Sequence, residues 1–363
     1  MNPYRGLPST NFWSSGVALA PPGGIDPMQN PKFTVGPDDK VATMGSCFAQ
    51  HISRHIERIG LRYLVTEEAD GHLSPADERR RNYRVFSARY GNVYTVRQAR
   101  QLFERAFGLF VPDELVWQKD DRFVDPLRPQ IEPDCFESVD ELHESRELHL
   151  NAVRRLFLEA DVLVFTLGLT ETFESVSDGT VYPVAPGVHG GAFATDAHRF
   201  VNFRVAEVIE DLEAFVDAVR GVNPDIRILL TVSPVPLIAT YEQRHVLVSN
   251  TISKATLRVA AAEVVASRSF VEYFPSYEII AGSADGAHYF APDLRQVEQR
   301  GVDHVMRVFQ RHMIDGAADA EAALLPPAVS HPTIARPNVV CDEETIEASL
   351  RVAGLSDAAP AAS

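Results

Sequence analysis

Two spacing patterns of apolar residues alternate along the chain. Continuous apolar runs, typical of strands buried on both faces, occur at 41–44, 61–65, 161–169, 226–232 and 270–273. Apolar residues recur every three or four positions at 49–59, 205–219, 253–267 and 292–312, which is the spacing of helices packed by one face. Gly60 and Gly221 end the first two helical segments, and Pro292 suits the first turn of the last one. This alternation predicts an α/β fold with a parallel sheet covered by helices on both faces.

Three segments depart from the alternation. Residues 1–37 are rich in proline, glycine and asparagine, and we expect an arm that wraps the domain and is anchored by Phe12 and Trp13. Residues from about 67 to 151 hold charged and aromatic side chains with one helix at 96–107, and we interpret them as an inserted, lid-like segment beside the site. Residues 315–363 are dominated by alanine, proline and aspartate, which predicts a loosely ordered tail. The catalytic domain would then span residues 38–314.

Composition excludes several classes of function. The 363 residues carry a formal net charge of −16, which argues against a general nucleic-acid binder and against binding to an anionic membrane surface. No apolar run reaches about 18 residues, and the first 20 residues lack a signal-peptide pattern, so we expect no membrane insertion. Cys47, Cys135 and Cys341 are too few and too far apart for a disulfide framework or a zinc site. We expect a cytoplasmic protein without a metal or other cofactor, and the sequence leaves its oligomeric state open.

Candidate chemistry falls where predicted strands end, because ligands of open α/β sheets bind at the carboxyl ends of strands. Ser46 follows the run 41–44 and precedes a helix, whose N-terminal dipole favours a developing oxyanion. The same position also suits a serine that only caps the helix. Asp285 and His288 lie three residues apart before the last helix, so that the aspartate could orient a histidine that accepts the serine proton. An ordinary surface turn would explain that pair equally.

Two neighbours of Ser46 offer other chemistry. His51 and His55 lie four residues apart, a spacing compatible with metal binding, but no His-Glu-x-x-His motif is present and we interpret them as part of a solvated helix face. Cys47 could be a thiolate at a helix N-terminus. Since adjacent side chains point in different directions, we interpret Cys47 as a small buried packing residue.

The segment Met44-Gly45-Ser46-Cys47-Phe48-Ala49 resembles the signature of the GSCFA-domain family, which is similar to the SGNH (GDSL-like) hydrolases. Further segments typical of the family are Tyr4-Arg5, Phe12-Trp13, Tyr90-Gly91-Asn92-Val93-Tyr94-Thr95, Thr166-Leu167-Gly168-Leu169-Thr170-Glu171, Ser233-Pro234-Val235 and Tyr273-Phe274-Pro275-Ser276-Tyr277-Glu278. The resemblance covers about residues 4–312. It implies a flavodoxin-like (SGNH-hydrolase-like) parallel sheet and a serine-dependent ester hydrolase.

The resemblance also implies roles for individual residues. Ser46 matches the nucleophile, His288 the base and Asp285 its orienting acid. Gly91 matches a glycine whose backbone N–H joins that of Ser46 in the oxyanion hole. Asn92 is a candidate for the side-chain donor to the oxyanion.

One departure from the SGNH pattern lies after the central strand. Those enzymes carry Gly-x-Asn-Asp there, whereas this chain has Gly168-Leu169-Thr170-Glu171, and a carboxylate cannot donate to an oxyanion unless it is protonated. Thr170 could replace the missing donor, and Thr170 and Glu171 are candidates for substrate binding. The segment could equally be a strand exit with a capping threonine.

From these observations we expect one of three functions. The first is an esterase that removes acyl groups from a carbohydrate or another small ester. The second is an O-acyltransferase that uses Ser46 and His288 on a sugar acceptor, since both reactions share the covalent intermediate. The third is a non-catalytic binding module in which Ser46 only caps a helix.

Overall fold

The computed structural model describes residues 2–69, 71–282 and 288–316. Its central sheet has four parallel strands in the order β1 (Val41–Gly45), β4 (Val162–Leu167), β8 (Arg227–Val232) and β9 (Val271–Tyr273). These strands are almost entirely buried, which explains why they read as continuous apolar runs. The α/β fold with a parallel sheet predicted from the sequence is therefore confirmed.

Helices cover both faces of this sheet. One face packs against α3 (Val96–Ala106), α4 (Val139–Glu159), α5 (Val205–Val222) and α6 (Val246–Ser267). The opposite face packs against α1 (Ala49–Arg58), α7 (Ser276–Ala281) and α8 (Gln299–Met313). Alternate residues of each strand divide between the two cores, because side chains of a strand point to opposite faces. In β4, for example, Leu163 and Phe165 contact the first layer, whereas Val162 and Val164 contact the second.

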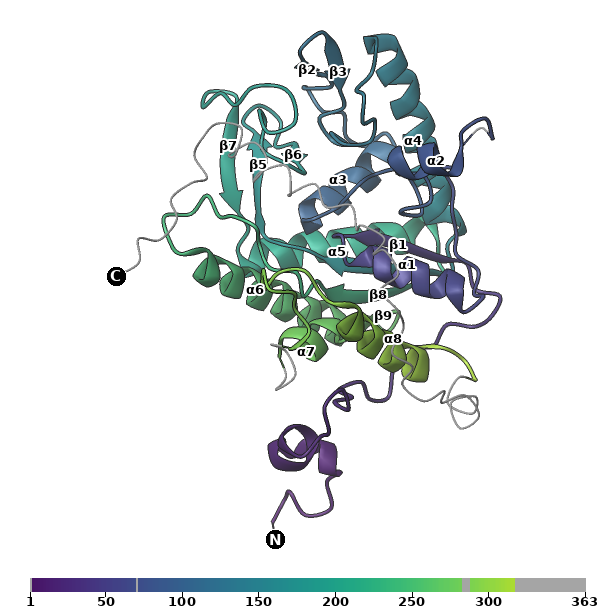
Figure 1. Ribbon diagram of the computed structural model, residues 1–363, viewed down its shortest axis with the longest axis vertical. Helices are drawn as coiled ribbons and strands as arrows, with labels where there is room; N and C mark the ends of the chain where they lie inside the picture. Colours follow the sequence, from purple (N-terminus) through teal and green to yellow (C-terminus); the bar gives the residue numbers. More distant parts are fainter. Residues whose placement is uncertain (1, 70, 283–287, 317–363) are drawn as a thin grey trace.

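Smaller elements lie at the end of the molecule away from α7 and α8 (Figure 1). A three-stranded antiparallel sheet has the order β6 (Val181–Tyr182), β5 (Glu171–Ser175) and β7 (His198–Asn202). A hairpin, β2 (Trp117–Lys119) and β3 (Arg122–Val124), and the short helix α2 (Pro75–Arg80) belong to the segment expected to be an insertion. This segment adds α3 and α4 to the main core, so it packs as part of the domain.

Several sequence predictions need correction. The run 61–65 forms no named strand: only Tyr63 makes a parallel bridge, to Val41 at the edge of the sheet. The last helix begins at Gln299, seven residues later than expected, and α6 begins at Val246, seven residues earlier.

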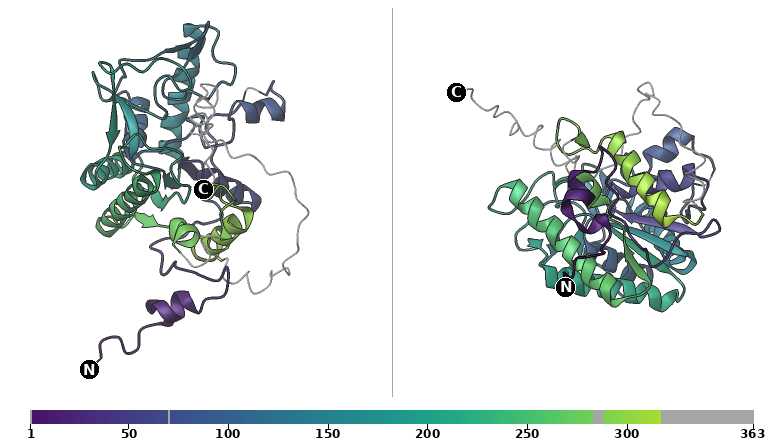
Figure 2. Two further views of the ribbon diagram at one scale, coloured as in Figure 1. Left: turned by 60° about the vertical axis from the view of Figure 1, so that its left-hand side comes forward. Right: turned by 90° about the horizontal axis from the view of Figure 1, so that it is seen from below.

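The N-terminal arm is anchored by different residues from those predicted. Residues 2–20, with the short helices η1 (Ser9–Asn11) and η2 (Ser14–Ala18), project from the body (Figure 2), and Trp13 is 73% exposed. Contact with the core begins further along, where Ile25, Met28 and Val35 are buried. Val35 then pairs with the segment after α8, donating its N–H to Met313 O at 2.6 Å. The bulky aromatic pair is therefore not the anchor.

Candidate active site

Ser46 is the first residue after β1, at the carboxyl edge of the parallel sheet. Its carbonyl accepts a hydrogen bond from Ala49 N at 2.9 Å, so the chain turns directly from the strand into α1. The side chain is only 3% exposed, and its Oγ has no hydrogen-bond partner among the described residues. Most buried hydroxyls are hydrogen-bonded, so an unpartnered one calls for an explanation. Ser46 also makes no side-chain capping bond to α1, which weakens the interpretation of this residue as a helix cap.

Two glycines bring the backbones of β1 and β4 close together at Ser46. Gly45 has φ of +124°, and a Cβ there would lie 2.2 Å from Thr166 O. A Cβ on Gly168 would lie 2.9 Å from Tyr94 O and 3.2 Å from the Cβ of Ser46. Neither position has room for a side chain, so glycine is required at both for the strand ends to surround the serine.

The segment 90–95 forms the neighbouring wall. Tyr90 Oη donates to Thr43 O, and Val93 N donates to Gly45 O at 2.8 Å. Tyr94 O accepts from both Gly168 N and Leu169 N at 3.1 Å. These bonds fasten the segment across the carboxyl ends of β1 and β4, and hence beside Ser46.

A narrow cavity of about 10 Å³ opens at Ser46. Its lining residues are Ser46, Cys47, Tyr94, Gly168, Leu169, Ser233, Val235, Pro236, Leu237 and Lys254. They come from the ends of β1, β4 and β8, from the segment 90–95 and from α6. The cavity therefore occupies the place where an α/β sheet binds its ligands.

Lys254 is the site residue that sequence reasoning missed. It is 1% exposed and its Nζ donates to Gly168 O at 2.7 Å, next to Ser46. It lies on the buried face of α6 together with Leu257, Ala261 and Val264. A lysine at helical spacing within an otherwise apolar face was the available signal, because lysine is almost never fully buried without a specific partner.

The predicted base is placed outside this cavity. His288 is exposed and does not line the cavity at Ser46, and its predicted partner Asp285 lies outside the described residues. The chain that follows His288 does reach the cavity wall, where Arg295 Nε donates to Pro236 O at 3.1 Å. The structure thus brings the region after His288 to the site, but shows no contact between His288 and Ser46.

The predicted oxyanion donors are also partly engaged elsewhere. Ser46 N donates to Thr166 O at 3.0 Å, which extends the pairing of β1 with β4. Gly91, with φ of +70°, and Asn92 line a second cavity, beside Arg128 and Ile131. In this structure, therefore, these groups do not converge on the cavity at Ser46.

Thr170 and Glu171, the candidates for substrate binding, hold loops together instead. Thr170 Oγ1 donates to Asn202 Oδ1 at 2.8 Å, joining the entry of β5 to β7. Glu171 accepts from Thr240 Oγ1 at 2.8 Å, and burial raises the pKa of its carboxyl. Neither residue lines the cavity at Ser46, so neither contacts a small ligand bound there.

His51 and His55 are less exposed than predicted, whereas Cys47 is buried as predicted. His55 is buried, with its ring edge on Phe309 and Nδ1 2.7 Å from the Arg58 guanidinium, so the prediction of a solvated face is wrong. Burial and the Arg54 charge lower the pKa of the half-buried His51 to about 4. Cys47 is buried as predicted, and it contributes to the cavity wall.

Within residues 2–69, 71–282 and 288–316, no cluster of three or more His, Cys, Asp or Glu side chains is arranged to hold a metal ion. None of the helices in these ranges is both long and apolar enough to cross a membrane.

Comparison with known proteins places the chain beside one described family. The model of the GSCFA family matches residues 40–309, from just before β1 to a point within α8. No curated protein matches the sequence.

Proposed function

This chain belongs to the GSCFA family, and from that membership and the geometry at Ser46 we propose a serine-dependent acyl-transfer enzyme with Ser46 as the nucleophile. The observation that carries the proposal is the buried Ser46 Oγ, unpartnered among the described residues, on a residue that lines a cavity at the carboxyl edge of the sheet. A reactive hydroxyl must be left available for its substrate, whereas a structural one is normally bonded. The dipole at the start of α1 favours the negative charge that develops there.

The proposal includes a flavodoxin-like, SGNH-type architecture. The strand order β1-β4-β8-β9, with the Tyr63 bridge on the outer side of β1, supports it. In that scheme His288 is the base and Asp285 orients it. The contact of Arg295 with Pro236 supports this assignment, because the chain after His288 reaches the cavity.

The proposed reaction proceeds in two balanced steps. Ser46 Oγ bonds to the acyl carbon while its proton passes to the ring of His288, and the departing alcohol then takes that proton. In the second step water attacks the acyl-serine and loses a proton to His288. The bond from the acyl carbon to Ser46 Oγ then breaks, His288 returns that proton to Ser46 Oγ, and the acid departs. Backbone N–H groups of Ser46 and Gly91 and the Asn92 amide are the proposed oxyanion donors. Use of the Ser46 N–H would require release of its bond to Thr166 O.

A second candidate is an O-acyltransferase, in which a sugar hydroxyl replaces water. The 3% exposure of Ser46 favours it, because a shielded acyl-enzyme survives long enough to meet an acceptor. Carbohydrate esters are the proposed substrate class in both cases. Adding a sugar acceptor to an activated-ester assay distinguishes the two: faster turnover with an acylated sugar product indicates transfer.

Labelling with a fluorophosphonate probe tests the nucleophile. We expect wild-type protein and Cys47→Ala to be labelled and Ser46→Ala not to be, with all three sharing the same melting temperature. Equal labelling of Ser46→Ala would refute the assignment. Absence of labelling in every variant would favour a non-catalytic binding module. His288→Ala should react at least about 100-fold more slowly if His288 is the base.

A further inference from the structure

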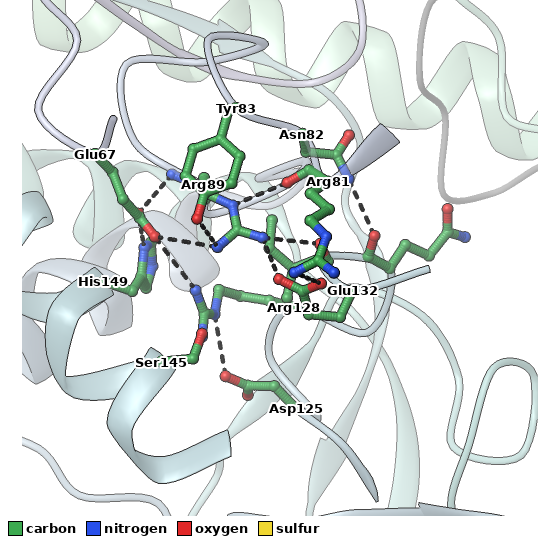
Figure 3. A network of polar contacts seen from close by, with 12 residues as sticks. Glu67, Arg81, Asn82, Tyr83, Arg89, Asp125, Arg128, Glu132, Ser145 and His149 are labelled. Carbon is green, nitrogen blue, oxygen red and sulfur yellow. Dashed lines mark hydrogen bonds and ion pairs between the residues drawn. The ribbon is translucent and has the colours of Figure 1, made fainter. Parts of the chain in front are cut away.

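A cluster of buried charged side chains, from residues between 67 and 149, forms a network of polar contacts (Figure 3). Asp125, fully buried, pairs with Arg128 Nε at 3.0 Å and with Arg146 Nη2 at 3.1 Å. Glu67 lies 2.7 Å from His149 Nδ1 and accepts from the backbone N–H of Arg89 at 2.8 Å. These contacts connect elements far apart in sequence into one polar core.

The charges in this core do not balance. Four buried arginines, Arg89, Arg105, Arg128 and Arg146, face three carboxylates, those of Glu67, Asp125 and Glu132. Arg81, at the exposed rim, pairs with Glu132 and adds a further positive charge. His149 does not change this excess of positive charge. Burial and Arg128 lower its pKa to about 4, so its ring is neutral at pH 7.

Arg105 carries the excess charge. It projects from α3, is 8% exposed, and forms no ion pair within 4 Å with any described carboxylate. Burial lowers its pKa to about 10, which still leaves the guanidinium charged at neutral pH. Asp125 attracts Arg105, but that one carboxylate is shared with Arg128 and Arg146. Buried charges are normally compensated by an opposite charge, so a fourth arginine around these acids leaves room for a further anion.

A cavity of about 20 Å³ lies beside this arginine. Its polar wall is formed by Tyr90, Gln98, Gln101, Arg105, Arg128 and His149. Two of these side chains have a buried nitrogen donor without a hydrogen-bond partner among the described residues: Arg105 Nη2 and Arg128 Nη1. The Nε2 of His149 is also unpartnered, but it is an acceptor, because Nδ1 of the neutral ring carries the proton that faces Glu67. Arg128 Nη1 lies 3.9 Å from Glu67 Oε1, beyond hydrogen-bonding distance.

We propose that this cavity binds one small monovalent anion of about the size of chloride. The two guanidinium nitrogens supply its donors, and its single charge balances the fourth arginine. The space open to the centre of a water-sized particle is about 20 Å³, which is enough for one small ion. A water could accept the same hydrogen bonds but would leave the charge of Arg105 uncompensated. This site is separate from Ser46 and does not rest on the proposed function.

Thermal unfolding in matched salts tests the site. Wild-type protein is melted in sodium chloride and in sodium gluconate at equal ionic strength, since gluconate is too large for the cavity. Chloride should raise the melting temperature by about 2 °C at saturating concentration, because it binds only the folded state. Equal melting temperatures in the two salts would overturn the proposal.

Arg105→Met should remove the chloride effect. This variant deletes the excess charge and keeps the volume, so its melting temperature in gluconate should equal or exceed that of the wild type. Arg100→Met is the matched control on the same helix, because Arg100 pairs with Glu104 and Asp211 and lies outside the cavity. It should lose stability equally in both salts and keep the chloride shift. A chloride shift retained in Arg105→Met would contradict the assignment.

A second measurement decides the matter if Arg105→Met does not fold. Wild-type crystals soaked in sodium bromide should show an anomalous peak within hydrogen-bonding distance of Arg105 Nη2 and Arg128 Nη1. A water without anomalous signal in that cavity would refute the site.

Discussion

Replacement of Gly45 by alanine tests the packing that places Ser46. The added Cβ would lie 2.2 Å from Thr166 O, 2.7 Å from Thr166 N and 2.8 Å from Thr166 C, all of them backbone atoms in the middle of the sheet. No side-chain rotation can relieve this overlap, so β1 and β4 must separate locally. The φ of +124° adds conformational strain for any residue with a Cβ.

The expected loss in the free energy of unfolding is the sum of three contributions. Strain at this φ costs about 1–3 kcal/mol, backbone displacement in a packed core costs about 1–3 kcal/mol, and weakening the bond from Ser46 N to Thr166 O costs about 1 kcal/mol. Together they predict a fall of about 3–7 kcal/mol in the free energy of unfolding. That is a large part of the total stability of a typical domain, about 5–15 kcal/mol.

Gly60→Ala is the matched control. Gly60 also has a positive φ, +78°, but a Cβ there would meet no atom within 4 Å. This variant should lose only about 1–2 kcal/mol. Urea unfolding of both variants, followed by circular dichroism, compares them directly. If Gly45→Ala loses no more stability than Gly60→Ala, the close approach of β1 and β4 is not what requires a glycine before Ser46.

Three further predictions concern buried polar groups. Burial, with Arg58, lowers the pKa of His55 to about 4, and the pKa of His149 is lowered to the same value. The unfolded chain, with histidine pKa values of about 6.5, therefore binds more protons. The free energy of unfolding should fall as pH falls from 6.5 to 4, and a flat urea-unfolding profile over this range would contradict it. Lys254→Met should slow probe labelling at least about 10-fold, because Gly168 O loses its buried donor and shifts beside the serine; an unchanged labelling rate would refute that positioning role. Asp125→Asn should cost about 3–5 kcal/mol in urea unfolding by leaving buried guanidinium groups uncompensated, whereas a loss below about 1 kcal/mol would show that the ion pairs are not needed.

The central fold follows from the sequence because its strands are buried on both faces. Val162 to Leu167 is apolar at nearly every position, and such a run has few alternatives to a central parallel strand. The sheet of β5, β6 and β7 was not predicted. Strands β5 and β7 are short, largely polar and only partly buried, and β6 is buried but has only two residues, so none of them carries a continuous apolar signal. The prediction of a strand at 61–65 was wrong because the apolar residues of this run pack against the core, while only Tyr63 pairs with β1.

The site was predictable only where the strand pattern defined it. The position of Ser46 follows from the end of β1 and the start of α1. Lys254 enters the cavity from a helix more than 200 residues away in sequence, and only its unusual place on an apolar face pointed to it. Whether Gly91 faces Ser46 depends on the path of a loop, which apolar spacing does not determine. Its position in the second cavity could be known only from the structure.

The most direct test of the central claim is the identity of the residue that reacts. Wild-type protein is treated with the fluorophosphonate probe, its intact mass is measured, and the adduct is located by peptide mapping. We predict a single adduct on Ser46, with no modification of Cys47. An adduct on any other residue, or an unmodified protein after prolonged treatment, would contradict the assignment of Ser46 as the nucleophile.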